Sequence, residues 1–215
     1  MDTTEFTNCT CEGRAFVADD IRIEETVITI DGVTYEVVAD GVMKVNEVYE
    51  ISNAAGMFWF ANEVNVNMNA FSGKTVKLTA NIDLNNEAWT PVGQTGATLF
   101  KGTFDGNNKK ISNLKINTKA QTGANYSSGL FGWLNAATVK NVLVSGAYVE
   151  GNHNVAVIAG YLETTGCTVE NCDVENATVI GYHANDDACG DKVGGVVGHA
   201  GNAGVVVKDC DIKNS

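Results

Sequence analysis

The second half of the chain repeats a short pattern at nearly regular intervals. Four segments follow the order apolar-x-Asn/Asp-apolar-x-apolar, and successive segments start 28, 30 and 38 residues apart. Their first residues are Ile111, Val139, Val169 and Val207. A second motif, which ends in two apolar residues and Gly, keeps phase with the last three, at 129–132, 157–160 and 195–198. Two motifs in phase over three units indicate a repeat protein whose units stack on one another.

The repeat unit predicts strands, because its apolar positions alternate, whereas helical repeats space them by three and four. The composition agrees, since the 215 residues include one Pro and 23 Gly, which is typical of strands joined by tight turns. We therefore predict an all-β chain. Its main part is a right-handed parallel β-helix over about 74–215, with coils about 4.8 Å apart.

Stacked coils predict columns of equivalent side chains. A polar column is expected at one bend, where each side-chain amide can donate to the next coil and satisfy a polar group that the bend leaves inside. Its members are Asn113, Asn141, Asn171 and Asp209. On the outside, Lys140, Glu170 and Lys208 form a column of alternating charge that favours the same register.

Two stretches of the chain resemble a known family. The stretch 100–116, FKGTFDGNNKKISNLKI, followed by Gly129-Leu-Phe-Gly132, is similar to GLUG-motif repeats. These occur in large bacterial surface or secreted proteins, including adhesin-like proteins and regions of IgA-specific peptidases. The resemblance covers about 48–215, and the site at 157–160 departs from the pattern by lacking its first Gly. It implies an extracellular or cell-surface module without catalytic residues, for adhesion, for binding a glycan or a host-surface protein, or as a spacer.

Three parts of the chain are expected. Residues 1–47 form an acidic segment with a small antiparallel β meander, signalled by two Asp-Gly turns at 31–32 and 40–41. Residues 48–73 hold a capping helix and a connection, and 74–215 are the β-helix. Because the chain stops three residues after a repeat strand, we expect the β-helix to be a fragment of a longer solenoid.

The helix is expected at 52–65, with Ser52 as its cap. One apolar face would carry Ala54, Phe58, Ala61 and Val64. The first coil of a solenoid exposes an apolar end that has to be covered. The aromatic residues 58–60 suit this helix to be the cover.

Charge and composition exclude several classes of partner. The formal net charge is −12, and residues 1–50 hold 12 acidic against 3 basic residues, which argues against nucleic acid. No apolar run is long enough to span a membrane, and the first residues do not read as a signal peptide. The six cysteines show no Cys-x-x-Cys pair, so we expect reduced thiols rather than a zinc site. The oligomeric state stays open between monomer and trimer.

An enzymatic alternative rests on two carboxylates. Asp173 and Asp211 occupy the same outward position on neighbouring coils, and retaining glycosidases hold two carboxyl groups about 5 Å apart. The alternative function is therefore a polysaccharide-degrading β-helix hydrolase, lyase or depolymerase. Stacked acids also arise on a solvated face, so the two interpretations compete, and the non-catalytic one is preferred.

No cofactor is expected, although one loop offers oxygen ligands. The stretch 182–191 contains Asp186, Asp187 and Asp191, residue types that bind Ca²⁺. Their order does not match the EF-hand loop, and a solvated acidic loop explains them as well.

The ligand-binding prediction concerns an aromatic column. The residues that directly follow the three Gly-ending motifs are Trp133, Tyr161 and His199. Stacked on successive coils, they would present flat rings to the apolar faces of sugars. The opposite orientation, with the rings in the core, stays open because Gly interrupts the alternation of the strand there.

Overall fold

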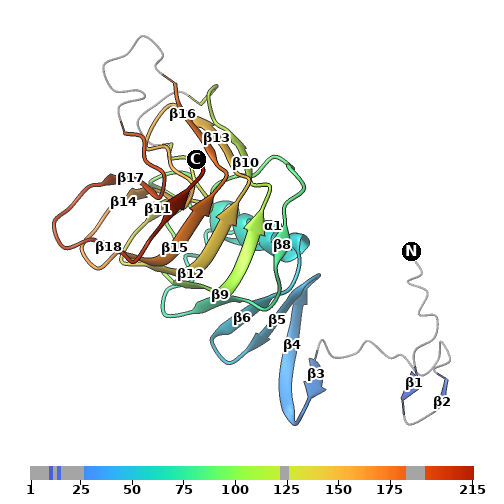
Figure 1. The fold of residues 1–215 in the computed structure, drawn as a ribbon. Coiled ribbons are helices and arrows are strands. Elements are labelled where there is room, and N and C mark those ends of the chain that lie inside the picture. The colour runs from blue at the N-terminus through green and yellow to red at the C-terminus, as the bar shows by residue number, and fades with distance from the viewer. Residues whose placement is uncertain (1–9, 12–13, 16–26, 122–125, 183–191) are drawn as a thin grey trace.

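The computed structural model describes residues 10–11, 14–15, 27–121, 126–182 and 192–215 (Figure 1). The described residues are 49% strand and 7% helix and form a β-solenoid of about four turns, with one short helix among them near the N-terminus. The predicted fold class, an all-β parallel β-helix with a helix and an antiparallel meander before it, is confirmed. A separate antiparallel pair, β1 (Thr10–Cys11) and β2 (Arg14–Ala15), lies near the N-terminus.

The meander comprises four antiparallel strands, β3 (Val27–Ile30), β4 (Val33–Ala39), β5 (Val42–Val45) and β6 (Val48–Ile51). Asp31 and Gly32 have φ angles of 49° and 80° at the first turn, as the Asp-Gly hairpin signal requires. Strand β6 is antiparallel to β5 but parallel to β7 (Thr75–Leu78). The meander and the solenoid therefore share one continuous sheet, which runs across the expected boundary at residue 47.

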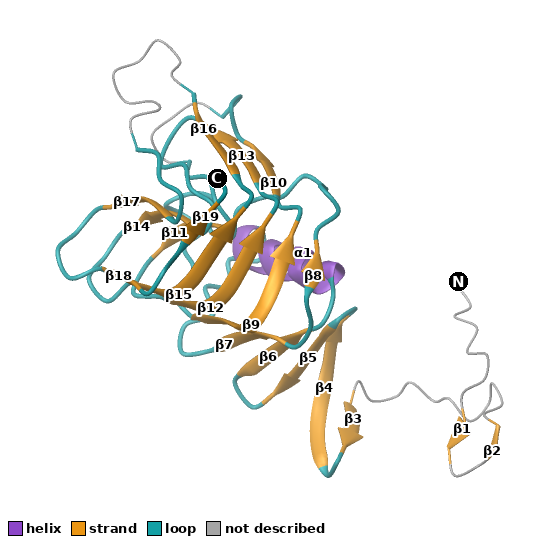
Figure 2. Ribbon diagram, in the orientation of Figure 1, coloured by secondary structure: helices purple, strands orange, loops and turns teal. Residues whose placement is uncertain are grey.

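Three parallel sheets surround the interior of the solenoid (Figure 2). The first continues from β7 through β9 (Thr103–Ser112), β12 (Thr138–Ser145), β15 (Thr168–Glu175) and β18 (Val206–Lys208), with β8 (Ile82–Asp83) beside β9 and β19 (Ile212–Lys213) beside β15. The second consists of β10 (Lys115–Asn117), β13 (Tyr148–Gly151) and β16 (Thr178–Gly181). The third consists of β11 (Phe131–Leu134), β14 (Ala159–Leu162) and β17 (Val197–Ala200). Three coils, β9–β11, β12–β14 and β15–β17, thus contribute one strand to each sheet.

The register corrects the repeat alignment at its first unit. Ile111 pairs with Val144, whereas the alignment placed it beside Val139, and Val139 pairs with Phe104. The pairing of β9 with β12 is irregular between Lys140 and Val142. The sequence misled because the apolar-x-Asn-apolar-x-apolar pattern occurs at two bends, with positive φ at Asn141 and Asn171 in one and at Asn113 and Asn176 in the other.

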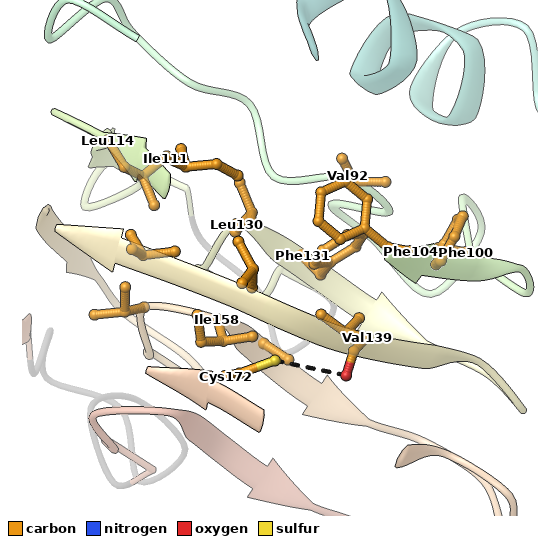
Figure 3. Packing of buried hydrophobic residues seen from close by; sticks show 14 of the residues in the cluster. Val92, Phe100, Phe104, Ile111, Leu114, Leu130, Phe131, Val139, Ile158 and Cys172 are labelled. Carbon is orange, nitrogen blue, oxygen red and sulfur yellow. Dashed lines mark hydrogen bonds between the residues drawn. The ribbon is translucent and has the colours of Figure 1, made fainter. Parts of the chain in front are cut away.

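The core consists of apolar columns that follow this register. Phe104, Val139 and Val169 lie on neighbouring strands of the first sheet, and all three are fully buried. Figure 3 shows this cluster, including Phe131 of the third sheet and the contact from Cys172 Sγ to the carbonyl oxygen of Val139 at 3.6 Å. Burying a side chain of this size contributes about 1.5–3 kcal/mol, so the columns account for much of the stability.

The helix α1 (Ala54–Asn65) covers part of this core. Its N-cap is Asn53, whose Oδ1 accepts from the backbone N–H of Gly56 at 2.9 Å. The prediction of Ser52 is wrong by one residue, because the Ser52 hydroxyl donates to the carbonyl of Gly41 instead.

The buried face of α1 is rotated relative to the prediction. Its buried apolar side chains are Met57, Phe60, Ala61 and Val64, whereas Ala54 and Phe58 are only partly buried. The Phe60 ring lies 5.2 Å from that of Phe71, 5.4 Å from Phe100 and 6.1 Å from Phe104, between ring centroids. The helix is therefore joined to the first coils by aromatic packing.

Within the described ranges, no helix combines the length and the apolar character needed to cross a membrane.

Candidate functional site

The three residues of the predicted aromatic column lie side by side on the third sheet. Trp133 pairs with Tyr161, and Tyr161 pairs with His199. The ring centroids of Trp133 and Tyr161 are 4.4 Å apart with planes at 81°, and those of Tyr161 and His199 are 4.7 Å apart with planes at 23°. All three side chains are half-buried. The predicted adjacency of the three residues is therefore confirmed. Their half-buried side chains fit neither a column that faces solvent fully nor one that lies wholly in the core.

The rings of this column contact one another and nearby backbone. A Cβ atom added to Gly96 would lie 3.5 Å from the Trp133 ring, and one added to Gly201 would collide with the Tyr161 hydroxyl. The Trp133 Nε1 atom is buried and has no hydrogen-bond partner in the described part of the chain. Because Tyr161 and His199 stack directly, a sugar ring cannot enter between them.

A ladder of amides connects three coils at one bend of the first sheet. Asn171 Nδ2 donates to Asn141 Oδ1 at 2.9 Å, and Asn141 Nδ2 donates to Asp105 Oδ1 at 3.0 Å. Asp105 Oδ1 also accepts from the backbone N–H of Asn107 at 2.8 Å. A carboxylate can accept several hydrogen bonds but donate none. The Asp105 carboxylate therefore ends the ladder.

Two predicted members do not extend this ladder. Asn113 lies at the other bend, where its Nδ2 donates to Asp83 Oδ1 at 2.8 Å. Asp209 has the same left-handed backbone conformation, with φ 53°, but its carboxylate has no N–H that could donate to Asn171. The prediction for Asn113 was wrong because it used the repeat alignment that the register overturns.

The second bend has the same hydrogen-bonding arrangement, with Asp83 as the acceptor. Asp83 Oδ1 accepts from the backbone N–H of Asn85 at 2.8 Å as well as from the Asn113 amide. The Asn85 hydrogen bond, followed by that of Asn113, lowers the pKa of the Asp83 carboxyl below its usual 3.8. Each bend thus pairs an Asn with an Asp of the preceding coil.

The outer charged column is longer than the sequence indicated. In register order its members are Glu50, Lys77, Asp105, Lys140, Glu170 and Lys208. The Nζ of Lys140 is 3.7 Å from an Asp105 oxygen, and that of Lys208 is 2.9 Å from a Glu170 oxygen. The hydrogen bond and charge of Glu170 raise the pKa of Lys208. The sign of the charge alternates over six neighbouring strands. Each charged side chain therefore has neighbours of opposite charge on the adjacent strands, which favours this register.

The two carboxylates of the enzymatic alternative lie on neighbouring coils. Val174 pairs with Ile212, so Asp173 and Asp211 occupy matching positions. Asp173 Oδ1 accepts from the backbone N–H of Asp211 at 3.0 Å. On its other side, Asp173 pairs with Leu143. The Asp173 carboxylate therefore connects coils, and its other strand neighbour is apolar.

The predicted calcium ligands Asp186, Asp187 and Asp191 lie outside the described residues. Among the residues that are described, no three His, Cys, Asp or Glu side chains come together as metal ligands. Cys167 and Cys172 are free and buried. Burial raises the pKa of the Cys172 thiol to about 12, so this cysteine stays protonated and packs as a small apolar side chain.

Three parallel sheets with stacked aromatic, amide and charged columns define a parallel β-solenoid. No family model matches the chain, so the resemblance to GLUG repeats has no support of that kind. The sequence is 31% identical over 201 residues to halomucin of Haloquadratum walsbyi, and the match covers 89% of this chain and 2% of halomucin. The chain thus corresponds to a small part of that protein.

The structure is similar to the crystal structure of a proposed immunoglobulin A1 protease from Bacteroides ovatus. The TM-score is 0.54 at 20% sequence identity, over 76% of this chain and 56% of the other. At this identity the likeness concerns the fold alone.

Proposed function

We propose that this chain is a non-catalytic β-helix module of a larger surface-exposed or secreted protein, in which it acts as a rigid support for adhesion. The charged column from Glu50 to Lys208 carries this proposal, because charges of alternating sign on six neighbouring strands favour one register of the coils. Its length and regularity suit a support that carries load along its axis. The similarity to halomucin and the β-helix neighbour both fit a surface module.

The non-catalytic role is supported by the surroundings of Asp173. A retaining glycosidase needs one carboxylate as a nucleophile and the other as an acid, both facing the substrate. Asp173 instead accepts a backbone N–H from Asp211 itself. A reducing-end assay on polysaccharides tests this point, and release of new reducing ends that Asp173→Asn abolishes would favour the enzymatic alternative.

The experiment that tests surface exposure is antibody labelling of the source organism. We expect intact cells, or the medium around them, to carry the epitope, and brief protease treatment of whole cells to remove the cell-bound fraction. A cytoplasmic protein of known location is the matched control. Labelling that needs permeabilised cells would contradict the proposal.

A second function, glycan or host-surface binding, is favoured by the aromatic column. Tyr161 and His199 stack face to face, and all three side chains of the column are half-buried, so a ligand would reach ring edges. Binding along these edges would use hydrogen bonds and ring edges rather than stacking on ring faces. Loss of binding to a glycan array in Trp133→Phe, which keeps a ring but reduces its size, tests this role.

A further inference from the structure

The outer face of the sheet β10–β13–β16 differs from the rest of the solenoid, because it carries exposed rings. Tyr148 and Tyr182 are each 39% exposed, and Ile180 between them along the sheet is 37% exposed. This sheet lies at the top of the view in Figure 1, apart from the strands that carry Trp133. We propose that this face, which we call the tyrosine face, binds a neutral oligosaccharide.

One polar network joins the two tyrosines. The Glu150 carboxylate accepts from the Tyr148 hydroxyl at 3.3 Å and from Asn117 Nδ2 at 3.4 Å, and it pairs with Lys119 Nζ at 3.5 Å. The same Lys119 Nζ lies 4.4 Å from the centroid of the Tyr182 ring. The cation over the Tyr182 ring, together with two hydrogen bonds and one ion pair on the Glu150 carboxylate, holds these side chains in place before a ligand arrives. Such preorganisation lowers the entropic cost of binding.

The chemistry of the face matches a sugar. Exposed tyrosine rings and the Ile180 side chain provide apolar area for the C–H faces of pyranose rings. Glu150 and Asn117, which lie beside the rings, can exchange hydrogen bonds with hydroxyl groups. Lys119 and Glu150 form an ion pair, so the charge left unbalanced among these side chains is that of the exposed Lys115 beside Tyr148. A neutral ligand with apolar faces and many hydroxyls fits this combination.

The spacing of the tyrosines sets the size of the ligand. Tyr148 pairs with Thr178, and Gly151 pairs with Gly181, so Tyr182 lies four residues further along the neighbouring strand. At about 3.3 Å per residue and about 4.8 Å between strands, the two Cα atoms are about 14 Å apart. A ligand that touches both rings must therefore be an oligosaccharide of several units.

The tyrosine face also differs from the aromatic column in what covers its rings. The column stacks His199 on Tyr161 at 4.7 Å, whereas the partner of the Tyr182 ring is the Lys119 side chain, itself 46% exposed. Tyr148 and Tyr182 are each 39% exposed, whereas the rings of the column belong to half-buried residues. The tyrosine face is therefore a separate site.

The test measures binding of neutral hexasaccharides by isothermal titration calorimetry. The probes are cello-, xylo-, manno-, malto- and chitohexaose, with a hyaluronan hexasaccharide as the acidic comparison. We expect at least one neutral probe to bind the parent protein. Tyr148→Ala and Tyr182→Ala should each weaken that binding about ten-fold or more, and Tyr148→Phe should weaken it less because the ring remains.

Two control variants separate this proposal from others. Tyr35→Ala removes a tyrosine of the meander and should leave binding of the hexasaccharide unchanged, and Trp133→Phe reports whether the aromatic column takes part. Circular dichroism confirms that each variant is folded. Absence of binding by every neutral probe, a preference for the acidic probe, or equal affinity in Tyr148→Ala, Tyr182→Ala and the parent would overturn the proposal. Loss of binding in Trp133→Phe alone would assign the site to the aromatic column.

Discussion

The side-chain amide of Asn171 donates to Oδ1 of Asn141, 2.9 Å away, although the two residues are 30 positions apart in the chain. Both residues have positive φ, 49° and 56°, so the same bend recurs on neighbouring coils. Asn141 in turn donates from Nδ2 to Oδ1 of Asp105. The bend and the ladder thus depend on the same residue type, since Asn tolerates the left-handed conformation and also carries the amide.

The first prediction concerns this ladder. Asn141→Ala should lower the free energy of unfolding by about 1–3 kcal/mol, because Asn171 and Asp105 both lose a partner. Asn171→Ala should cost less, about 1 kcal/mol, because Asn171 is exposed. Denaturant unfolding measures both. Asn141→Gly is the matched control, since it keeps the backbone conformation and removes only the amide; stability equal to the parent in this variant would show that the ladder contributes nothing.

The second prediction concerns the aromatic column. Trp133→Ala should cost about 2–4 kcal/mol, somewhat less than a fully buried aromatic residue, because its half-buried ring contacts Tyr161. Tyr148 is also aromatic but exposed, so Tyr148→Ala should change the free energy of unfolding by less than about 0.5 kcal/mol. Thermal unfolding compares the two. A Trp133→Ala midpoint as high as that of Tyr148→Ala would mean that the column does not support the fold.

The third prediction concerns the pH dependence of stability. The pKa of Asp83 is lowered in the folded chain, so its contribution is complete well above 3.8 and is lost as the pH falls through the lowered folded value. Asp83→Asn keeps an acceptor oxygen but removes the charge. We expect the parent to melt higher than this variant near neutral pH and the gap to close in acid. A gap that is constant across this range would contradict the prediction.

The fourth prediction concerns thiol reactivity. Burial raises the pKa of Cys172 to about 12, so the reactive thiolate is scarce at mildly alkaline pH. Native protein treated with iodoacetamide should leave Cys172 unmodified, as read by peptide mass spectrometry. The same treatment in denaturant is the control and should modify it. Rapid alkylation of Cys172 in the folded chain would show that the interior opens more readily than its packing implies.

Several features of this protein could be predicted from the sequence because they depend on local pattern. Alternating apolar residues and two motifs in phase predict a stacked β-structure, whatever the exact pairing. The neighbours Asn141 and Asn171 follow from one repeat interval, since the chain between them makes one regular coil. Trp133 and Tyr161 are adjacent for the same reason.

Other features were decided only by the tertiary structure. The pairing of Ile111 with Val144 depends on an irregularity in the strand pairing that no local pattern marks. The sequence could not distinguish Ser52 from Asn53 as the N-cap, because both residue types can cap a helix. The packing of Phe60 against Phe104 determines which face of the helix is buried.

The faces of the solenoid show the same division. Glycine interrupts the strand before Trp133, so the sequence could not assign its orientation, and the contacts with Tyr161 and the turn at Gly96 determined it. Tyr148 and Tyr182 are 34 positions apart and belong to no repeated motif. Only the pairing of β13 with β16 places them on one face. The sequence by itself therefore determined the kind of coil, through the local preferences of each residue, whereas the tertiary structure decided which coil positions meet, because register depends on the summed packing of several strands.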